Sequence, residues 1–145
     1  MAQLTKRAIS QSSDIRELAI ETSTGFGSNG PIDACHRIAL LVRSCFCIID
    51  EPEELLIDPI LQFKAYKEKG VVYGDCDDVA TFTACLTYAI GIPTRFKAIN
   101  QGEDGSFQHV FTEVQIGETW KPLDATLLAN QELRYDPNDC IVEYL

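Results

Sequence analysis

The side chains that could carry out a reaction in this chain are a thiol, an imidazole and a carboxylate at Cys76, His109 and Asp124. Cys76 lies at the start of a predicted helix over Asp77–Ile90, which carries no charge past Asp78 and should therefore be buried on most sides. A cysteine at a helix N-terminus lies beside unpaired amides and the positive end of the helix dipole, which stabilise a thiolate. We therefore predict that Cys76 is a nucleophile.

Three aspartates flank this cysteine, at positions 75, 77 and 78. Asp75 is suited to cap the helix, and Asp77 and Asp78 are suited to its first turn. Their negative charges would also oppose a thiolate, so a purely structural Cys76 is the alternative. Asp77 and Asp78, together with Glu113, would favour a basic substrate, although a solvated acidic rim explains them equally well.

A predicted β-hairpin brings the imidazole and the carboxylate together. Residues 106–116 alternate as a strand does, and Gly117-Glu118 fits a two-residue turn with glycine first. Phe111 then lies opposite Asp124. His109 is the diagonal neighbour of Asp124, about 7–8 Å away at the backbone. An Asp–His hydrogen bond is expected. The other histidine, His36, lies beside an apolar helix face and is interpreted as structural.

A thiol, an imidazole and a carboxylate in this chain order form a nucleophile–base–orienter set. The residues around them resemble the transglutaminase-like superfamily. The blocks that carry the resemblance are Tyr73–Ala80, Gly91–Phe96, His109–Val114 and Trp120–Thr126. The compact size is most similar to small prokaryotic or phage-encoded members.

The resemblance implies an α+β, papain-like core in which N-terminal helices precede an antiparallel sheet. It assigns Cys76 as the nucleophile at the start of a buried helix, His109 as general base and acid, and Asp124 as the residue that orients His109. The family's oxyanion donor lies upstream of the cysteine, where Tyr73 and Gln62 are both candidates. The backbone amide of Cys76 is a third candidate, since a helix N-terminus offers one. The large β domains and calcium sites of animal transglutaminases have no room in 145 residues.

The other elements follow from periodicity and from turn residues. One domain is expected over 1–145, with an N-terminal helix and connector in 1–30 and the core in 31–145. The expected helical segments are 14–21, a helix from Pro31, a turn over 51–56, and 60–69; the strands are 94–99, 106–116, 119–123 and 140–145. The core stripe of the helix from Pro31 is expected at Ile32, Cys35, Ala39, Val42 and Phe46.

Charge and composition narrow the classes of partner. The chain has 12 basic and 22 acidic side chains, a net charge of −10, with 46% apolar and 23% charged residues. The apolar and charged shares are typical of a soluble globular protein. The excess of acidic side chains argues against nucleic acid and anionic membranes as partners. The sequence shows no signal peptide and no membrane-spanning run. We expect a cytoplasmic protein, associated with a virion if it is phage-encoded.

The six cysteines do not form a metal-binding or disulfide pattern. No Cys-x-x-Cys pair occurs, and the five other than Cys76 lie among apolar residues, where a reduced cysteine acts as a small hydrophobic side chain. We expect no metal and no cofactor. A small metal or redox protein built on these cysteines is the alternative.

These inferences predict a thiol-dependent acyl-transfer enzyme that hydrolyses amide or peptide bonds. Its substrate would be a protein, a peptide or a small amide. The alternatives are a protein-crosslinking transglutaminase and a catalytically silent structural or interaction module of a phage particle. The sequence indicates no oligomeric state.

Overall fold

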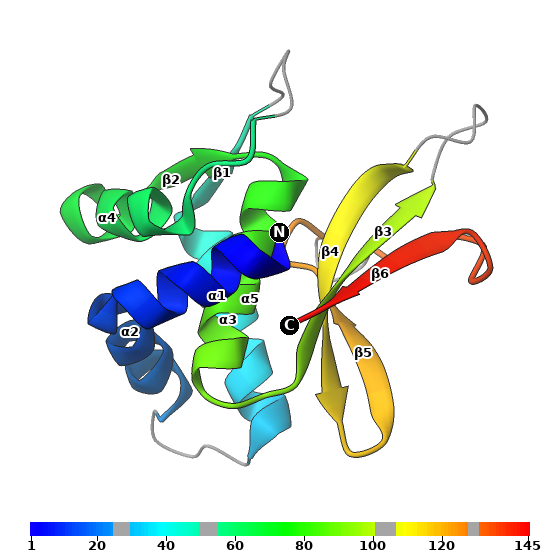
Figure 1. Cartoon of the computed structure of the whole chain (residues 1–145), viewed down its shortest axis with the longest axis horizontal. Helices are drawn as coiled ribbons and strands as arrows, with labels where there is room; N and C mark the ends of the chain where they lie inside the picture. The colour runs from blue at the N-terminus through cyan, green and yellow to red at the C-terminus, as the bar shows by residue number, and fades with distance from the viewer. Residues whose placement is uncertain (25–29, 50–54, 101–106, 128–130) are drawn as a thin grey trace.

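The computed structural model describes residues 1–24, 30–49, 55–100, 107–127 and 131–145, and arranges them as a layer of helices beside an antiparallel sheet (Figure 1). The helices are α1 (Ala2–Gln11), α2 (Ser13–Ser23), α3 (Pro31–Cys45), α4 (Pro59–Lys69) and α5 (Cys76–Ala89). The strands are β1 (Phe46–Ile48), β2 (Val72–Gly74), β3 (Thr94–Asn100), β4 (Phe107–Ile116), β5 (Thr119–Leu123) and β6 (Cys140–Tyr144). Helices that precede an antiparallel sheet confirm the predicted α+β class.

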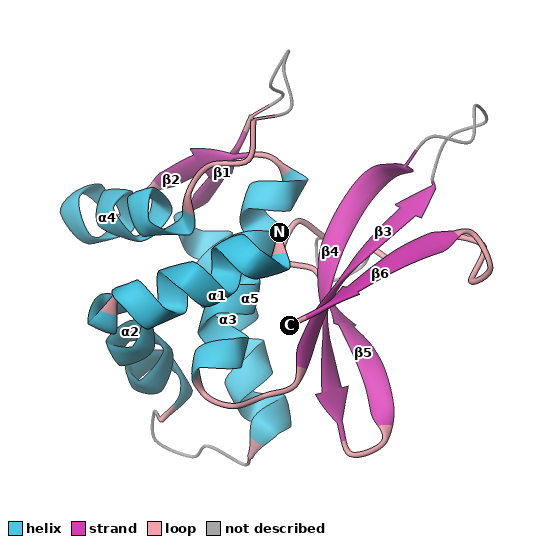
Figure 2. Ribbon diagram, in the orientation of Figure 1, coloured by secondary structure: helices cyan, strands magenta, loops and turns pink. Residues whose placement is uncertain are grey.

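Helix α5 lies at the centre of the molecule, between the other helices and the sheet (Figure 2). Every residue from 78 to 87 is buried, which confirms the prediction made from its lack of charge. Phe82 contacts several aromatic residues of the helical core. Its ring stacks on Phe63 at 4.0 Å between centroids and packs edge-on against Phe46 at 5.3 Å. Gly91 follows the helix with φ 83°, a conformation that favours glycine, and helix α5 ends there as predicted.

The four-stranded sheet has the order β5-β4-β3-β6. Strands β4 and β5 pair from Ile116 opposite Thr119 to Thr112 opposite Leu123, without a bulge. Gly117 has φ 64° in the turn, so the predicted two-residue hairpin and its register are confirmed. Pro122 fits because β5 is an edge strand, where a missing N–H breaks no pairing within the sheet.

Two parts of the fold are absent from the sequence predictions. Helix α1 buries Ala2, Thr5 and Ala8, and such small side chains give little periodic signal. Strands β1 and β2 form a separate parallel pair beside α4, and each is only three residues long (Figure 1). Strand β2 matters most for the site because it runs directly into α5.

The expected core stripe of α3 is wrong at its first position. Ile32 is 55% exposed, whereas Ala34 and Ile38 are buried. Helix α3 turns a face shifted from the predicted one toward α5, so that Ala39 is only half-buried, and Phe46 belongs to β1. The connector over 22–30 and the turn over 51–56 lie largely outside the described residues; of the parts described, 22 and 23 belong to α2, and 55 and 56 are not helical.

No helix within the described ranges is long and apolar enough to cross a membrane.

Candidate active site

Cys76 is the first residue of α5 and is half-buried. Strand β2 leads into the helix through Asp75, whose side chain accepts a hydrogen bond from the Asp77 amide at 3.2 Å. Asp78 completes a capping box by accepting from the Asp75 amide at 3.4 Å. The paired strand and the double cap therefore fix the turn that presents the thiol, as the helix-start prediction required.

Asp78 also ties this turn to the segment before α4. Its Oδ1 accepts from the Ile57 amide at 2.9 Å and from Nε2 of Gln62 at 2.8 Å, and the residue is fully buried. Gly74 is required beside it, because a Cβ at that position would lie 2.5 Å from Asp78 Oδ2. Asp78 is therefore an internal support for the start of α5, and the interpretation of this residue as part of an acidic rim is wrong.

Asp77 lines the same small pocket as the thiol. Burial raises its pKa to about 8, with further contributions from its hydrogen bond to Asp75 and from the charges of Asp75 and Asp78. The raised pKa favours the protonated form of Asp77. This reduces the negative charge that the sequence places beside Cys76.

His109 and Asp124 meet as the hairpin register predicts. Nε2 of His109 lies 2.5 Å from Oδ2 of Asp124, and the two side chains are 13% and 3% exposed. Burial lowers the pKa of His109, but hydrogen bonds and charges from Asp124 and Cys76 outweigh it and raise the pKa to about 9. Burial raises the pKa of Asp124, but His109 and Thr126 outweigh that effect and lower it below its ordinary value. The geometry thus favours an imidazolium–carboxylate pair next to the thiol.

Thr126 is a residue that the sequence reasoning missed. Its amide and its hydroxyl both donate to Oδ1 of Asp124, at 2.9 and 2.6 Å. The two carboxylate oxygens therefore have separate partners, with Oδ2 facing His109. An aspartate followed two residues later by threonine is the signature of such a local turn, so the signal was present in the sequence.

A small pocket of about 120 Å³ opens where α5, β3 and β4 meet. Cys76, His109 and Asp77 line it, together with Ala98 and Gln108. Access to the thiol and the imidazole from one pocket is what an attack on a carbonyl group and a proton transfer require.

The candidate oxyanion donors are placed differently. Gln62 is 1% exposed and its amide donates to Asp78, so it faces the interior and does not line this pocket. Tyr73 is 54% exposed and does not line it either. The amide of Cys76 is the first of α5, where helix geometry provides no intrahelical acceptor. It is the candidate that remains beside the thiol.

Glu113 does not contribute to an acidic rim. It is 3% exposed and forms ion pairs with Arg95 at 2.5 Å and with Lys97 at 3.2 Å. Arg95 also lies 4.2 Å from the centroid of the Trp120 ring. This cluster links β3, β4 and β5 across the sheet.

Potential metal ligands among the described residues gather at the start of α5, where oxygens of Asp75, Asp77 and Asp78 lie within 4.8 Å of one another. The carboxylates of Asp75 and Asp78 accept hydrogen bonds from backbone amides and from Gln62, whereas Oδ1 of Asp77 is buried and has no hydrogen-bond partner within the described residues. All six cysteines are free thiols. Cys47 is exposed on β1, so the expectation that it packs as a hydrophobic side chain is wrong.

Comparisons with known proteins identify the family and support the fold. The family model of the transglutaminase-like superfamily matches residues 19–125. Among solved structures, the fold is similar to that of a candidate cysteine protease from Cytophaga hutchinsonii, with a TM-score of 0.62 and 20% identity over 92% of this chain and 42% of that one. It is also similar to a candidate protease from Parabacteroides distasonis, with a TM-score of 0.60 and 14% identity over 83% and 25%. The chain thus spans less than half the length of either structure, and no curated protein sequence matches it.

Proposed function

The chain belongs to the transglutaminase-like superfamily, and from this premise we propose that it is a cysteine-dependent acyl-transfer enzyme that hydrolyses amide or peptide bonds. Cys76 is the proposed nucleophile, His109 the general acid and base, and Asp124 the residue that orients His109. The observation that carries the proposal is the 2.5 Å contact between His109 and Asp124, with the same imidazole sharing one pocket with Cys76.

The proposed reaction begins with the Cys76 thiolate and the His109 imidazolium as an ion pair. Because Asp124 occupies Nε2 of His109, Nδ1 is the nitrogen that serves Cys76. The Cys76 sulfur attacks the substrate carbonyl carbon, and the resulting oxyanion accepts from the Cys76 amide. Nδ1–H of His109 then protonates the departing amine, and a thioester remains on Cys76.

A second nucleophile resolves the thioester. His109 takes a proton from water as the water attacks, and the acid and the thiolate are released. An amine in place of water would give transamidation, the reaction for which the family is named. We favour hydrolysis because both structural neighbours are described as proteases. The proposed substrates are proteins, peptides or small amides, and the free cysteines fit a reducing, cytoplasmic setting.

A chromogenic ester, whose alcohol is released when Cys76 is acylated, distinguishes hydrolysis, transamidation and a catalytically silent module. With p-nitrophenyl acetate, wild-type protein should release p-nitrophenol in a burst followed by turnover, while Cys76→Ala should do neither. Cys47→Ala, which removes an exposed thiol, is the matched control and should behave as wild type. Adding hydroxylamine or cadaverine should leave acetate as the main product; a dominant amide product would identify a transamidase. No burst from wild-type protein would indicate a catalytically silent module and would refute the proposal.

A further inference from the structure

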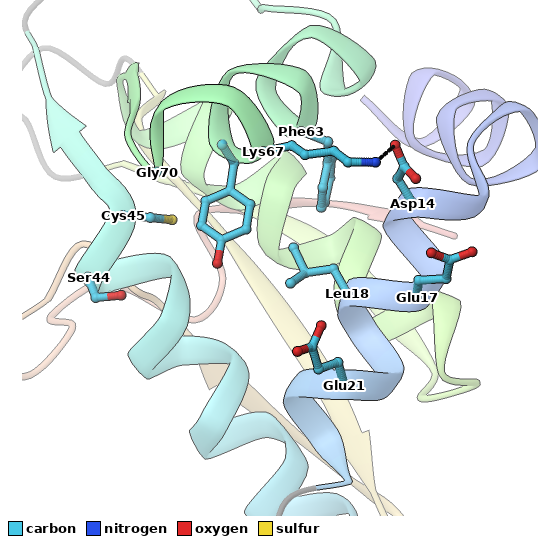
Figure 3. Close-up of a pocket in the computed structure, with 10 residues that line it drawn as sticks. Asp14, Glu17, Leu18, Glu21, Ser44, Cys45, Phe63, Lys67 and Gly70 are labelled. Atoms are coloured by element: carbon cyan, nitrogen blue, oxygen red, sulfur yellow. Dashed lines mark hydrogen bonds and ion pairs between the residues drawn. The ribbon is translucent and has the colours of Figure 1, made fainter.

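A larger groove lies on the helical layer and shares no lining residue with the pocket of Cys76. It has a volume of about 550 Å³ and is bounded by α2, the end of α3 and α4 (Figure 3). This size falls within the range of ligand pockets, roughly 300–1,000 Å³. The proposed reaction uses none of its residues.

The floor of the groove is apolar and well supported. Leu18 of α2 and Phe63 of α4 point toward each other across it (Figure 3), and the buried Cys45 also lines the groove. Phe63 is stacked on Phe82 in the core, so the floor is held from below. An apolar side chain that entered would gain from burial against these groups.

The wall supplied by α2 is acidic and only partly neutralised. Lys67 forms an ion pair with Asp14 at 3.0 Å, at one end of the groove. Glu17 and Glu21 also line the groove, and neither forms an ion pair with any residue in the described part of the chain. The groove therefore has an unbalanced negative charge at its other end.

The positions of Glu17 and Glu21 are unfavourable for the stability of α2. They lie four residues apart, where like charges repel on a helix. Glu21 is in the last turn, which contains no basic residue, although a helix C-terminus favours cations. A cationic partner would therefore relieve the repulsion between these two carboxylates.

Tyr66 is a further residue of the groove that could contact a bound cation. Tyr66 lines the groove, and its hydroxyl forms no hydrogen bond within the residues that the structure describes. Burial raises the pKa of Tyr66, and the nearby Cys45 and Glu21 raise it further, so the phenol stays neutral and available as a donor or acceptor. An aromatic ring beside carboxylates is a favourable surface for an organic cation.

We propose that this groove binds a peptide segment in which lysine or arginine alternates with apolar residues. The apolar side chain would pack on Leu18 and Phe63, and the cation would pair with Glu21 and Glu17. A free polyamine would satisfy the carboxylates but would leave the apolar floor uncovered. The proposal does not depend on acyl transfer at Cys76.

Titration of the ¹⁵N-labelled full chain with short blocked peptides tests this. The probes are acetylated, amidated peptides with the centres Leu-Lys-Leu-Lys, Leu-Gln-Leu-Gln, Leu-Glu-Leu-Glu and Gly-Lys-Gly-Lys, with spermine as a fifth ligand. Leu-Lys-Leu-Lys should bind best, should shift amides of α2 and α4, and should weaken as salt is added.

Paired variants identify the groups responsible. Glu17→Gln with Glu21→Gln should weaken binding of Leu-Lys-Leu-Lys by about 3- to 30-fold, because each exposed ion pair contributes modestly. The double variant should melt at the same or a higher temperature, since like-charge repulsion in α2 is relieved. Glu118→Gln with Glu132→Gln makes the same charge change at exposed sites outside the groove and should leave binding unchanged.

Several results would overturn the proposal. Equal loss in both double variants would show only a general effect of net charge. Shifts confined to residues around Cys76 and His109 would place the peptide in the catalytic pocket. Spermine or Gly-Lys-Gly-Lys binding as tightly as Leu-Lys-Leu-Lys would show that the apolar floor takes no part, and no binding of any peptide would refute the groove as a peptide site.

Discussion

Replacing Asp124 by asparagine changes one atom of the proposed triad and keeps its shape. Asparagine Oδ1 can still accept from the amide and hydroxyl of Thr126, so the local turn should persist. Its Nδ2 would then donate to Nε2 of His109 instead of accepting from it. The imidazole would keep its only proton on Nδ1, the nitrogen proposed to receive the proton of the Cys76 thiol, and catalysis should be impaired.

The size of the effect follows from the pKa of His109. Its rise from 6.5 to about 9 corresponds to about 3 kcal/mol, or about 300-fold, in favour of the imidazolium. This figure is the net result of burial, which lowers the pKa of His109, and of Asp124 and Cys76, which raise it. We expect kcat/KM for p-nitrophenyl acetate to fall by about 10- to 300-fold. The rate of Cys76 alkylation by iodoacetamide, followed by peptide mapping, should shift to higher pH because the imidazolium is lost earlier.

Asp136→Asn is the matched control. Asp136 also accepts from an amide two residues later, that of Asn138 at 2.8 Å, but it is exposed. This variant should change neither the activity nor the alkylation profile. If Asp124→Asn lowers the melting temperature while the alkylation profile of Cys76 stays in place, Asp124 is a structural residue of the turn and the orienting role is wrong. A loss of activity below about 3-fold would refute it equally.

Three further predictions concern reactivity and stability. Cys76 should be alkylated at neutral pH faster than Cys85, whose thiol is fully buried with a raised pKa; equal labelling in peptide maps would count against the site. The unfolding free energy of wild type should exceed that of His109→Gln most below pH 6.5, and the gap should shrink by up to about 3 kcal/mol as pH rises through about 9, because the stability contributed by a raised pKa is lost above it. A pH-independent gap in urea denaturation would contradict this. Glu113→Gln should cost about 1–3 kcal/mol in urea denaturation, because its two half-buried cationic partners lose their counter-charge, yet leave the activity of the folded protein unchanged.

Local patterns predicted most of what positions the site. The turn at Gly117-Glu118 and the alternation of β4 determine the register that brings His109 to Asp124. Capping residues and an uncharged run determine where α5 begins. Each of these features depends on residues close together in the chain, so the sequence alone was sufficient.

The remaining features depend on contacts between distant segments. The bond between Gln62 and Asp78 and the space left by Gly74 arise only when α4, β2 and α5 pack together. From the strand pattern alone, Glu113 is predicted to be an exposed acid. In the structure it is paired with two cationic side chains of the neighbouring strand β3. The face of α3 is likewise set by its packing partners, which is why Ile32 was misplaced.

Mass spectrometry of the intact protein mixed with p-nitrophenyl acetate and quenched in acid tests the central claim most directly. The account predicts a single acetyl group, mapped to Cys76, which accumulates within the burst and disappears as substrate is exhausted. Cys76→Ala should carry none, and the exposed Cys47 should remain unmodified on the same time scale. Acetylation of Cys47 at the same rate as Cys76, or no acetylation of Cys76, would contradict a nucleophilic thiol at the start of α5.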